Sequence, residues 1–195
     1  MRIGVDVDEV LAEFLQGMLP WLREEYDMRV SWYDMHTYAF YEAWHVPEDV
    51  ARERIDRFLE SQVFKSLDLV PGSRSGVARL AGEHSLVVVT SRPEYVGSVT
   101  RRWLQRSYGD VFEEVLLTNS HGVGASTSKA AMVGEHGVDV HVDDNPAYCN
   151  NIVERTCADA VLLSKPWNTS RSVDDEVFRA VSWEDILGVV EWIDT

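Results

Sequence analysis

The chain opens with Ile3-Gly4-Val5-Asp6-Val7-Asp8, a short apolar run that ends in two carboxylates. Its apolar residues predict a buried first strand. Four further apolar runs, separated by segments of helical length, span residues 86–90, 115–118, 138–142 and 160–163. Continuous apolar strands that alternate with helices are typical of a parallel sheet covered on both faces. We therefore predict an α/β fold, with a Rossmann-like parallel sheet of about five strands flanked by helices.

The segments between these runs carry helix start and stop signals. Pro93 suits the first position of a helix that Gly109 can close, and Ser182 followed by Asp185 resembles a capping box. Residues 127–135 and 146–155 have the same helical character. These helices would supply the layers that cover the sheet.

Residues 11–71 interrupt this alternation of strands and helices, because they contain no apolar run as strong as those of the five predicted strands. Residues 49–64 instead show helical periodicity. We predict a small helical insertion at residues 13–71, after the first strand, within a core formed by residues 1–12 and 72–195. The aromatic residues of the insertion favour a small hydrophobic core, with one or two left as candidates for stacking on a ligand: Trp32, Tyr33, Tyr38, Phe40, Tyr41 and Trp44.

The composition is that of an acidic globular protein. Of 195 residues, 18 are Lys or Arg and 33 are Asp or Glu, which gives a formal net charge of −15. A nucleic-acid polymer or an anionic membrane requires a basic surface, so neither is expected as a partner. No apolar run approaches the roughly 20 residues of a membrane span, and acidic residues interrupt the first run, so no secretory signal is expected. Two cysteines without CxxC spacing fit a cytoplasmic protein.

Polar clusters follow three of the predicted strands at their carboxyl ends. Asp6 and Asp8 end the first strand, Thr90-Ser91-Arg92 ends the second, and Asp143-Asp144 ends the fourth. Lys129 stands 14 residues before Asp143, at the start of a predicted helix. Ligands of open α/β sheets bind beyond such strand ends. We therefore expect these side chains to meet in one site.

The residue types in this set suit phosphoryl transfer. Clustered carboxylates need a hard cation, and Mg²⁺ takes oxygen ligands while keeping positions for phosphate oxygens. One aspartate can attack phosphorus, and a second, two residues on, can protonate the leaving oxygen and then activate water. Thr90 and Lys129 can donate to the transferred phosphoryl group. In so acidic a chain, an anionic substrate needs such local cations.

The chain resembles the haloacid dehalogenase-type phosphohydrolase superfamily in the order of four motifs: Asp6 to Val10, Thr90-Ser91, Lys129 and Asp143-Asp144. Within it, the chain is most similar to the 5'(3')-deoxyribonucleotidase-like group. The similarity rests on Thr90-Ser91-Arg92, on the helical insertion after the first motif and on Lys165-Pro166-Trp167-Asn168. Glu9 departs from the pattern, since many relatives have glycine there.

The resemblance implies a role for each matching residue. Asp6 would be the nucleophile and Asp8 the general acid and base. Mg²⁺ would bind the side chains of Asp6 and Asp143 and the backbone carbonyl of Asp8, with Asp144 supporting these ligands. The insertion would form a cap over the site. The phosphate would be held by Thr90, Ser91 and Lys129.

The implied activity is Mg²⁺-dependent hydrolysis of a phosphate monoester through an aspartyl-phosphate intermediate. The implied substrate is a nucleoside monophosphate, as for a 5'(3')-deoxyribonucleotidase. Two alternatives stay open: a phosphatase of a sugar phosphate or other small phosphorylated metabolite, and a non-catalytic cation- or partner-binding protein on the same scaffold. The complete set of acidic and phosphate-binding residues favours an enzyme.

Some of these residues also have an ordinary structural role open to them. Thr90 or Ser91 can cap the helix that follows. Arg92 either faces the substrate or pairs with an acid. His141 is expected to pack beside the site rather than to bind a metal ion.

Overall fold

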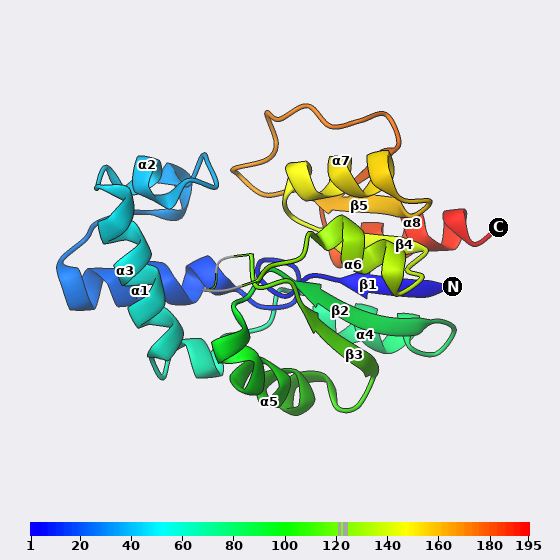
Figure 1. Cartoon of the computed structure of the whole chain (residues 1–195), viewed down its shortest axis with the longest axis horizontal. Coiled ribbons are helices and arrows are strands. Elements are labelled where there is room, and N and C mark those ends of the chain that lie inside the picture. Colours follow the sequence, from blue (N-terminus) through cyan, green and yellow to red (C-terminus); the bar gives the residue numbers. More distant parts are fainter. Residues whose placement is uncertain (121, 123–124) are drawn as a thin grey trace.

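The computed structural model describes residues 1–120, 122 and 125–195. Its centre is a parallel sheet of six strands in the order β3-β2-β1-β4-β5-β6 (Figure 1). The predicted α/β fold with a parallel sheet is confirmed. The strands are β1 (Arg2–Val5), β2 (Ser85–Thr90), β3 (Phe112–Leu117), β4 (Val140–Asp143), β5 (Asp159–Leu163) and β6 (Val177–Ala180).

The predicted number of strands is one too low. The additional strand, β6, lies at the edge of the sheet and pairs in parallel with β5, with Val177 opposite Ala160. Its four residues include the charged Arg179 and lack the continuous apolar run of the interior strands. An edge strand is covered less completely than a central one, so its sequence signal is weaker.

β1 lies at the centre of the sheet, between β2 and β4. Val5 pairs with Val88 of β2 on one side and with Val142 of β4 on the other. The backbone N–H of Asp6 donates to the carbonyl of Val142 at 3.0 Å, so the pairing continues to the first carboxylate. The carboxyl ends of β1, β2 and β4 therefore lie side by side.

Helices cover both faces of the sheet. Val88 of β2 packs in the hydrophobic core of one layer and Val87 in that of the other, because successive strand residues face opposite sides. The first layer contains α4 (Ser73–Leu80), α5 (Gly97–Tyr108) and α8 (Trp183–Ile193), and the second contains α6 (Lys129–Glu135) and α7 (Pro146–Arg155).

The predicted helices are present, with shifts at some ends. α7 has the predicted bounds, and α8 begins after Ser182, whose Oγ accepts a hydrogen bond from the backbone of Asp185 at 3.2 Å. Pro93 does not start α5, because a 3₁₀ turn, η3 (Glu94–Val96), comes first. Gly109 ends α5 as predicted, with a φ of +74° that suits glycine.

The insertion after β1 is helical, as predicted. Its α-helices, α1, α2 and α3, are grouped beyond the carboxyl ends of the strands (Figure 1). Phe58 packs edge-on against Phe14 and Phe64, with ring centroids 5.2 and 5.9 Å apart. No helix among the residues described above is long and apolar enough to cross a membrane. The elements of the insertion are α1 (Phe14–Tyr26), η1 (Trp32–Asp34), α2 (Phe40–Trp44), α3 (Glu48–Glu60) and η2 (Phe64–Ser66).

Candidate active site

A cavity of about 450 Å³ lies where the strand ends face the insertion. The strand ends contribute most of the predicted site residues: Asp6, Asp8, Thr90, Ser91, Arg92, Asp143 and Asp144. The insertion contributes a largely apolar and aromatic wall: Phe14, Leu15, Met35, Tyr38, Phe40, Tyr41, Ile55 and Leu59. The fold therefore brings the residues of three separate motifs into one cavity.

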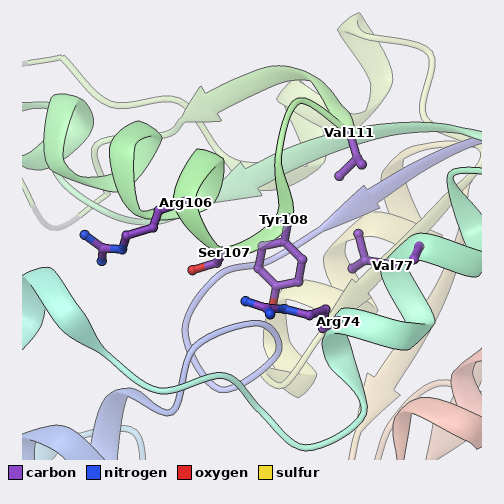
Figure 2. Close-up of a pocket in the computed structure, with 7 residues that line it drawn as sticks. Arg74, Val77, Arg106, Ser107, Tyr108 and Val111 are labelled. Carbon is purple, nitrogen blue, oxygen red and sulfur yellow. The ribbon is translucent and has the colours of Figure 1, made fainter.

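A smaller cleft of about 230 Å³ lies between α4 and α5, lined in part by Arg74 and Arg106 (Figure 2). No predicted site residue lines it. Tyr108 fills part of this cleft, and its hydroxyl donates to the carbonyl of Leu11 at 3.1 Å and bonds to Ser73 at 2.8 Å. Tyr108 thus ties α5 to the loop that follows the first motif.

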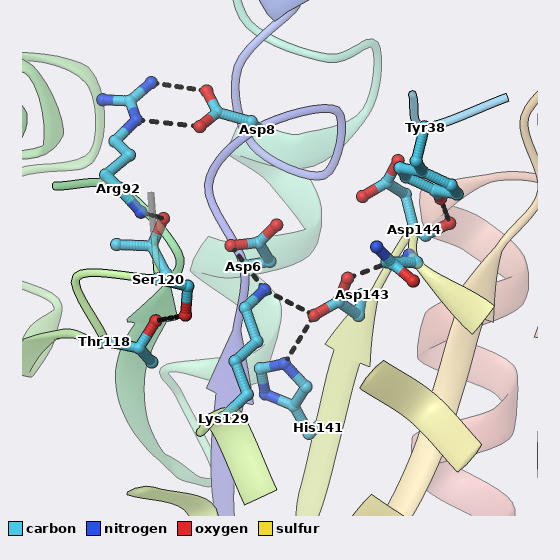
Figure 3. Close-up of polar contacts among 12 residues, drawn as sticks. Asp6, Asp8, Tyr38, Arg92, Thr118, Ser120, Lys129, His141, Asp143 and Asp144 are labelled. Carbon is cyan, nitrogen blue, oxygen red and sulfur yellow. Dashed lines mark hydrogen bonds and ion pairs between the residues drawn. The ribbon is translucent and has the colours of Figure 1, made fainter. Parts of the chain in front are cut away.

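Three buried aspartates and one buried lysine form the centre of the larger site (Figure 3). Asp6, Asp143 and Asp144 each place a carboxylate oxygen within 4.8 Å of the others. Lys129 Nζ lies 2.9 Å from Asp6 and 2.6 Å from Asp143. One lysine balances only part of the charge of three buried carboxylates, so this donor set fits a divalent cation with oxygen ligands.

Burial and charge separate the pKa values of this cluster. Burial raises the pKa of Asp6 and raises that of Asp144 well above its ordinary value, because the charged forms lose water. Burial acts in the same direction on Asp143, but Lys129 and its other partners outweigh it and hold the pKa of Asp143 below its ordinary value. Burial opposes the charge of Lys129, yet the two aspartates raise its pKa, so Lys129 stays charged.

His141 packs against Asp143 from within β4. Its Nε2 lies 3.0 Å from one Asp143 oxygen, and the imidazole is fully buried. Burial lowers the pKa of His141, so the ring is neutral at pH 7 and donates from Nε2. The backbone N–H of Asn145 donates to the other Asp143 oxygen at 2.9 Å. The orientation of Asp143 is therefore set from two sides.

Arg92 forms an ion pair with Asp8. Its Nε and Nη2 lie 3.0 and 2.6 Å from the two oxygens of the Asp8 carboxylate. The Arg92 side chain is 3% exposed, whereas that of Asp8 is 28% exposed. Of the two roles open to Arg92 from the sequence, the structure shows the pairing with an acid.

Thr90 and Ser91 lie at the end of β2 beside the cluster. Neither caps the helix that follows, since neither η3 nor α5 has a side-chain cap. Ser91 Oγ is buried without a hydrogen-bond partner within the part of the chain that the structure describes. A buried hydroxyl of this kind costs free energy unless a ligand or water pairs with it. Ser91 is thus available to an oxygen-rich ligand in the cavity.

Tyr38 and Ser120 are among the cavity residues that the sequence did not assign to the site. The Tyr38 hydroxyl donates to the backbone carbonyl of Asp144 and lies 3.1 Å from its carboxylate. Ser120 lines the cavity and bonds to Thr118 at 2.6 Å. The strand-end rule, applied to β3, points to Ser120. Nothing in the sequence separates Tyr38 from the other aromatic residues of the insertion.

The segment 165–168 forms a wall beside Asp144. Trp167 Nε1 donates to the Asp144 carboxylate at 2.7 Å, and Asn168 Nδ2 donates to its backbone carbonyl at 2.7 Å. Lys165 Nζ lies 3.3 Å from Glu9, so the carboxylate that replaces the common glycine has a nearby cation. The segment thus contacts two acidic residues at this edge of the site, Asp144 and Glu9.

The comparison with known families agrees with this geometry. Residues 1–193 match the family described as 5' nucleotidase, deoxy (pyrimidine), cytosolic type C protein. The chain belongs to this family. It is therefore an enzyme of the phosphatase and nucleotidase type within the haloacid dehalogenase-like hydrolases. This nucleotidase-family chain is also 20% identical over 193 residues to YqfW of Bacillus subtilis (strain 168), which is named as a candidate nucleotidase. The matched region covers 99% of this chain and 93% of YqfW.

Solved structures of haloacid dehalogenase-like hydrolases share the fold of this nucleotidase-family chain. A predicted phosphatase from Clostridium acetobutylicum has a TM-score of 0.69 at 12% identity, with 98% of each chain covered. The candidate HAD-hydrolase YfnB from Bacillus subtilis, whose structure is bound to magnesium, has a TM-score of 0.66 at 13% identity, with 97% of each chain covered. At these identities the likeness concerns the fold.

Proposed function

We propose that this enzyme hydrolyses the phosphate monoester of a nucleoside monophosphate with Mg²⁺, through an aspartyl phosphate on Asp6. One observation carries the proposal. Asp6 directly follows the central strand, and its carboxylate lies 2.9 Å from Lys129 Nζ and within 4.8 Å of carboxylate oxygens of Asp143 and Asp144. It opens into the same cavity as Ser91, whose hydroxyl has no hydrogen-bond partner among the residues that the structure describes. Membership of the nucleotidase family supports the same reaction.

In the first step, a carboxylate oxygen of Asp6 attacks phosphorus. The bond between phosphorus and the ester oxygen breaks, and Asp8 gives its proton to the leaving alcohol. Thr90, Ser91 and Lys129 hold the phosphoryl oxygens, and their donors stabilise the charge that develops on them. The product of this step is an aspartyl phosphate and the free alcohol.

In the second step, Asp8 now accepts a proton. It takes this proton from a water molecule, which attacks the phosphorus of the aspartyl phosphate. The bond between phosphorus and the Asp6 oxygen breaks, which releases inorganic phosphate and restores both carboxyl groups. The same residue thus acts as acid and then as base.

The donor set fits Mg²⁺. We propose that the side chains of Asp6 and Asp143 and the backbone carbonyl of Asp8 hold the ion, and Asp144 lies close enough to support them. When bound, Mg²⁺ neutralises charge on the carboxylates and on the phosphate, which lets two anions approach each other. The magnesium-bound structure of YfnB is consistent with this cofactor.

The shape and lining of the cavity support a nucleotide substrate. About 450 Å³ is enough for a group larger than phosphate, and the facing wall is aromatic. Tyr38 and Tyr41 are 36% and 37% exposed, so part of their surface is open to a base. Stacking on an aromatic ring contributes roughly 1–3 kcal/mol per base. We further propose a cytoplasmic location, since both cysteines are free.

The test is release of inorganic phosphate from deoxynucleoside, nucleoside and sugar monophosphates. Measurements are made with Mg²⁺, with a chelator, and with the variant Asp6→Asn. We expect release from nucleotides that requires Mg²⁺ and that falls by at least about a thousandfold in Asp6→Asn, because the amide cannot attack phosphorus. The matched control is Asp159→Asn. Asp159 stands at the amino end of β5, away from the strand ends that form the site, so this variant should keep the activity of the wild type.

The outcomes separate the parts of the proposal. Turnover in Asp6→Asn near the wild-type rate, with the fold intact by circular dichroism, would remove Asp6 as nucleophile. Release from sugar phosphates alone would keep the mechanism and exclude the nucleotide substrate. Full activity in the chelator would exclude Mg²⁺.

A further inference from the structure

We propose that Arg92 is a positioning residue, which holds the Asp8 carboxylate in place for proton transfer and couples it to the base of the insertion. The inference rests on the proposed function, because Asp8 is the general acid and base there. It assigns to Arg92 an effect on the reaction that passes through Asp8, with no direct contact to the substrate.

The first support is the geometry of the pair. Two nitrogens of the Arg92 guanidinium bond to the two oxygens of Asp8, at 3.0 and 2.6 Å. Two parallel bonds between planar groups fix the direction of the carboxylate as well as its distance. In Figure 3, the Asp8 carboxylate turns toward Arg92, while that of Asp6 lies beside Lys129. Each Asp8 oxygen keeps a second lone pair for a proton.

The second support is that the guanidinium itself is held by other elements. Its Nη1 donates to Thr100 Oγ1 of α5 at 3.1 Å, and Thr100 is fully buried. The ring of Phe64, in η2, lies against the guanidinium with its centroid 4.5 Å from Cζ. Arg92 is therefore anchored by the core on one side and by the insertion on the other.

These contacts leave little of the Arg92 guanidinium accessible to a substrate. All three guanidinium nitrogens have acceptors, one face is covered by Phe64, and the side chain is only 3% exposed. Both residues line the cavity, but the Asp8 side chain is 28% exposed, far more than that of Arg92. An effect of Arg92 on the reaction must then pass through Asp8.

The coupling to the insertion follows from the packing of Phe64. This ring also packs against Phe14 of α1 and Phe58 of α3, with centroids 6.4 and 5.9 Å apart. A displacement of these helices moves the ring that covers the guanidinium, and with it the partner of Asp8. The placement of the acid and base is thus connected to the placement of the insertion over the cavity.

The test uses leaving groups that differ in their need for a proton. We compare Arg92→Met with the wild type in single turnovers, measuring release of the alcohol from a nucleoside monophosphate and from an aryl phosphate. A phenolate of low pKa leaves without a proton, so its release should fall less than about threefold. Release of the nucleoside should fall at least about tenfold, with KM nearly unchanged.

Three further variants give the controls. Arg92→Lys should recover part of the rate, since a lysine pairs with one oxygen only. Arg102→Met removes an exposed arginine of α5 and should change nothing. In the Asp8→Asn background, Arg92→Met should cause no further loss, because the residue through which it acts is already disabled.

Several results would overturn the inference. A rise in KM with kcat preserved would make Arg92 a substrate contact. Equal losses for both leaving groups, or losses that multiply in the double variant, would show that Arg92 acts independently of Asp8. If the wild type hydrolyses no phosphate ester, the proposed function fails. The ion pair between Arg92 and Asp8 is then tested by denaturant unfolding of the wild type, Arg92→Met, Asp8→Asn and their double variant. If the shifts of the two single variants in the unfolding midpoint add up to that of the double variant, the two side chains do not interact and the ion pair is excluded.

Discussion

Glu9 illustrates how one residue combines strain with several contacts. Its φ of +63° is a conformation that favours glycine, so a glutamate is strained there. The side chain compensates in part, because its carboxylate accepts a hydrogen bond from the backbone of Leu15 at 2.7 Å, in the first turn of α1. Lys165 contributes the second contact.

The pKa of Glu9 leads to a prediction about stability and pH. Burial raises this pKa from 4.5 to about 7, despite Lys165. The folded protein therefore binds the proton more tightly than the unfolded chain, and unfolding between pH 4.5 and 7 releases it. We expect this group to lower the free energy of unfolding by about 3 kcal/mol as the pH rises through that range, with no further change above it.

Denaturant unfolding of the wild type and of Glu9→Gln, from pH 4.5 to 8, measures this effect. The amide of the variant cannot titrate, so the difference in free energy between the two proteins should grow with pH in favour of the variant. A difference that stays constant across the range would contradict the raised pKa.

At the scale of elements, the contact between α4 and α8 depends on one glycine. A Cβ at Gly76 would lie 2.3 Å from the ring of Trp183. The two helices can approach this closely only because glycine has no Cβ. The indole Nε1 of Trp183 also donates to the carbonyl of Val10 at 2.9 Å. The packing of these helices thus reaches the loop that follows Asp8.

Gly76→Ala should therefore lower the free energy of unfolding by about 1–3 kcal/mol, because the tryptophan must move in a closely packed core. Gly188→Ala is the matched substitution in α8, where an added Cβ meets nothing within 4 Å. It should raise stability by up to about 1 kcal/mol, since alanine favours a helix over glycine. Denaturant unfolding measures both, and equal effects of the two substitutions would contradict the packing.

At the scale of the whole molecule, the dominant feature is the net charge of −15. At the site, three cations each lie against an acid: Lys129 against Asp6, Arg92 against Asp8 and Lys165 against Glu9. Much of the remaining negative charge has no cation to balance it. Repulsion among these carboxylates opposes the compact state.

The melting temperature should therefore rise with salt. Ions at about 0.1 M screen charges beyond about 10 Å, which weakens long-range repulsion more than contacts between neighbours. We expect a higher midpoint in differential scanning calorimetry as NaCl increases from about 0.02 M to about 0.3 M. KCl should give the same rise, because screening depends on ionic strength. A fall in the midpoint, or a rise with one salt alone, would point to a different cause.

Much of the fold and of the site is local enough to be predicted. The apolar runs of β1, β2 and β4 are continuous because both of their faces are buried, so they are recognised without knowledge of their partners. Parallel pairing then brings their polar ends together, which placed Asp6, Thr90 and Asp143 correctly at one edge. Strand β6 was not predicted, because an edge strand does not need the continuous apolar run of a strand that is buried on both faces.

The remaining features depend on residues that are far apart in the chain. Arg92 meets Asp8 across 84 residues, and Tyr38 meets Asp144 across 106. Such contacts leave no periodicity in the sequence. Tyr38 reaches Asp144 because the insertion docks on the sheet, whereas Arg92 reaches Asp8 because β1 and β2 lie side by side. The chain's pattern of apolar runs and strand-end acids thus defined the sheet and the chemistry available at its edge. The partners and pKa values of those acids were decided by tertiary packing, because only burial and long-range contacts set which charges meet.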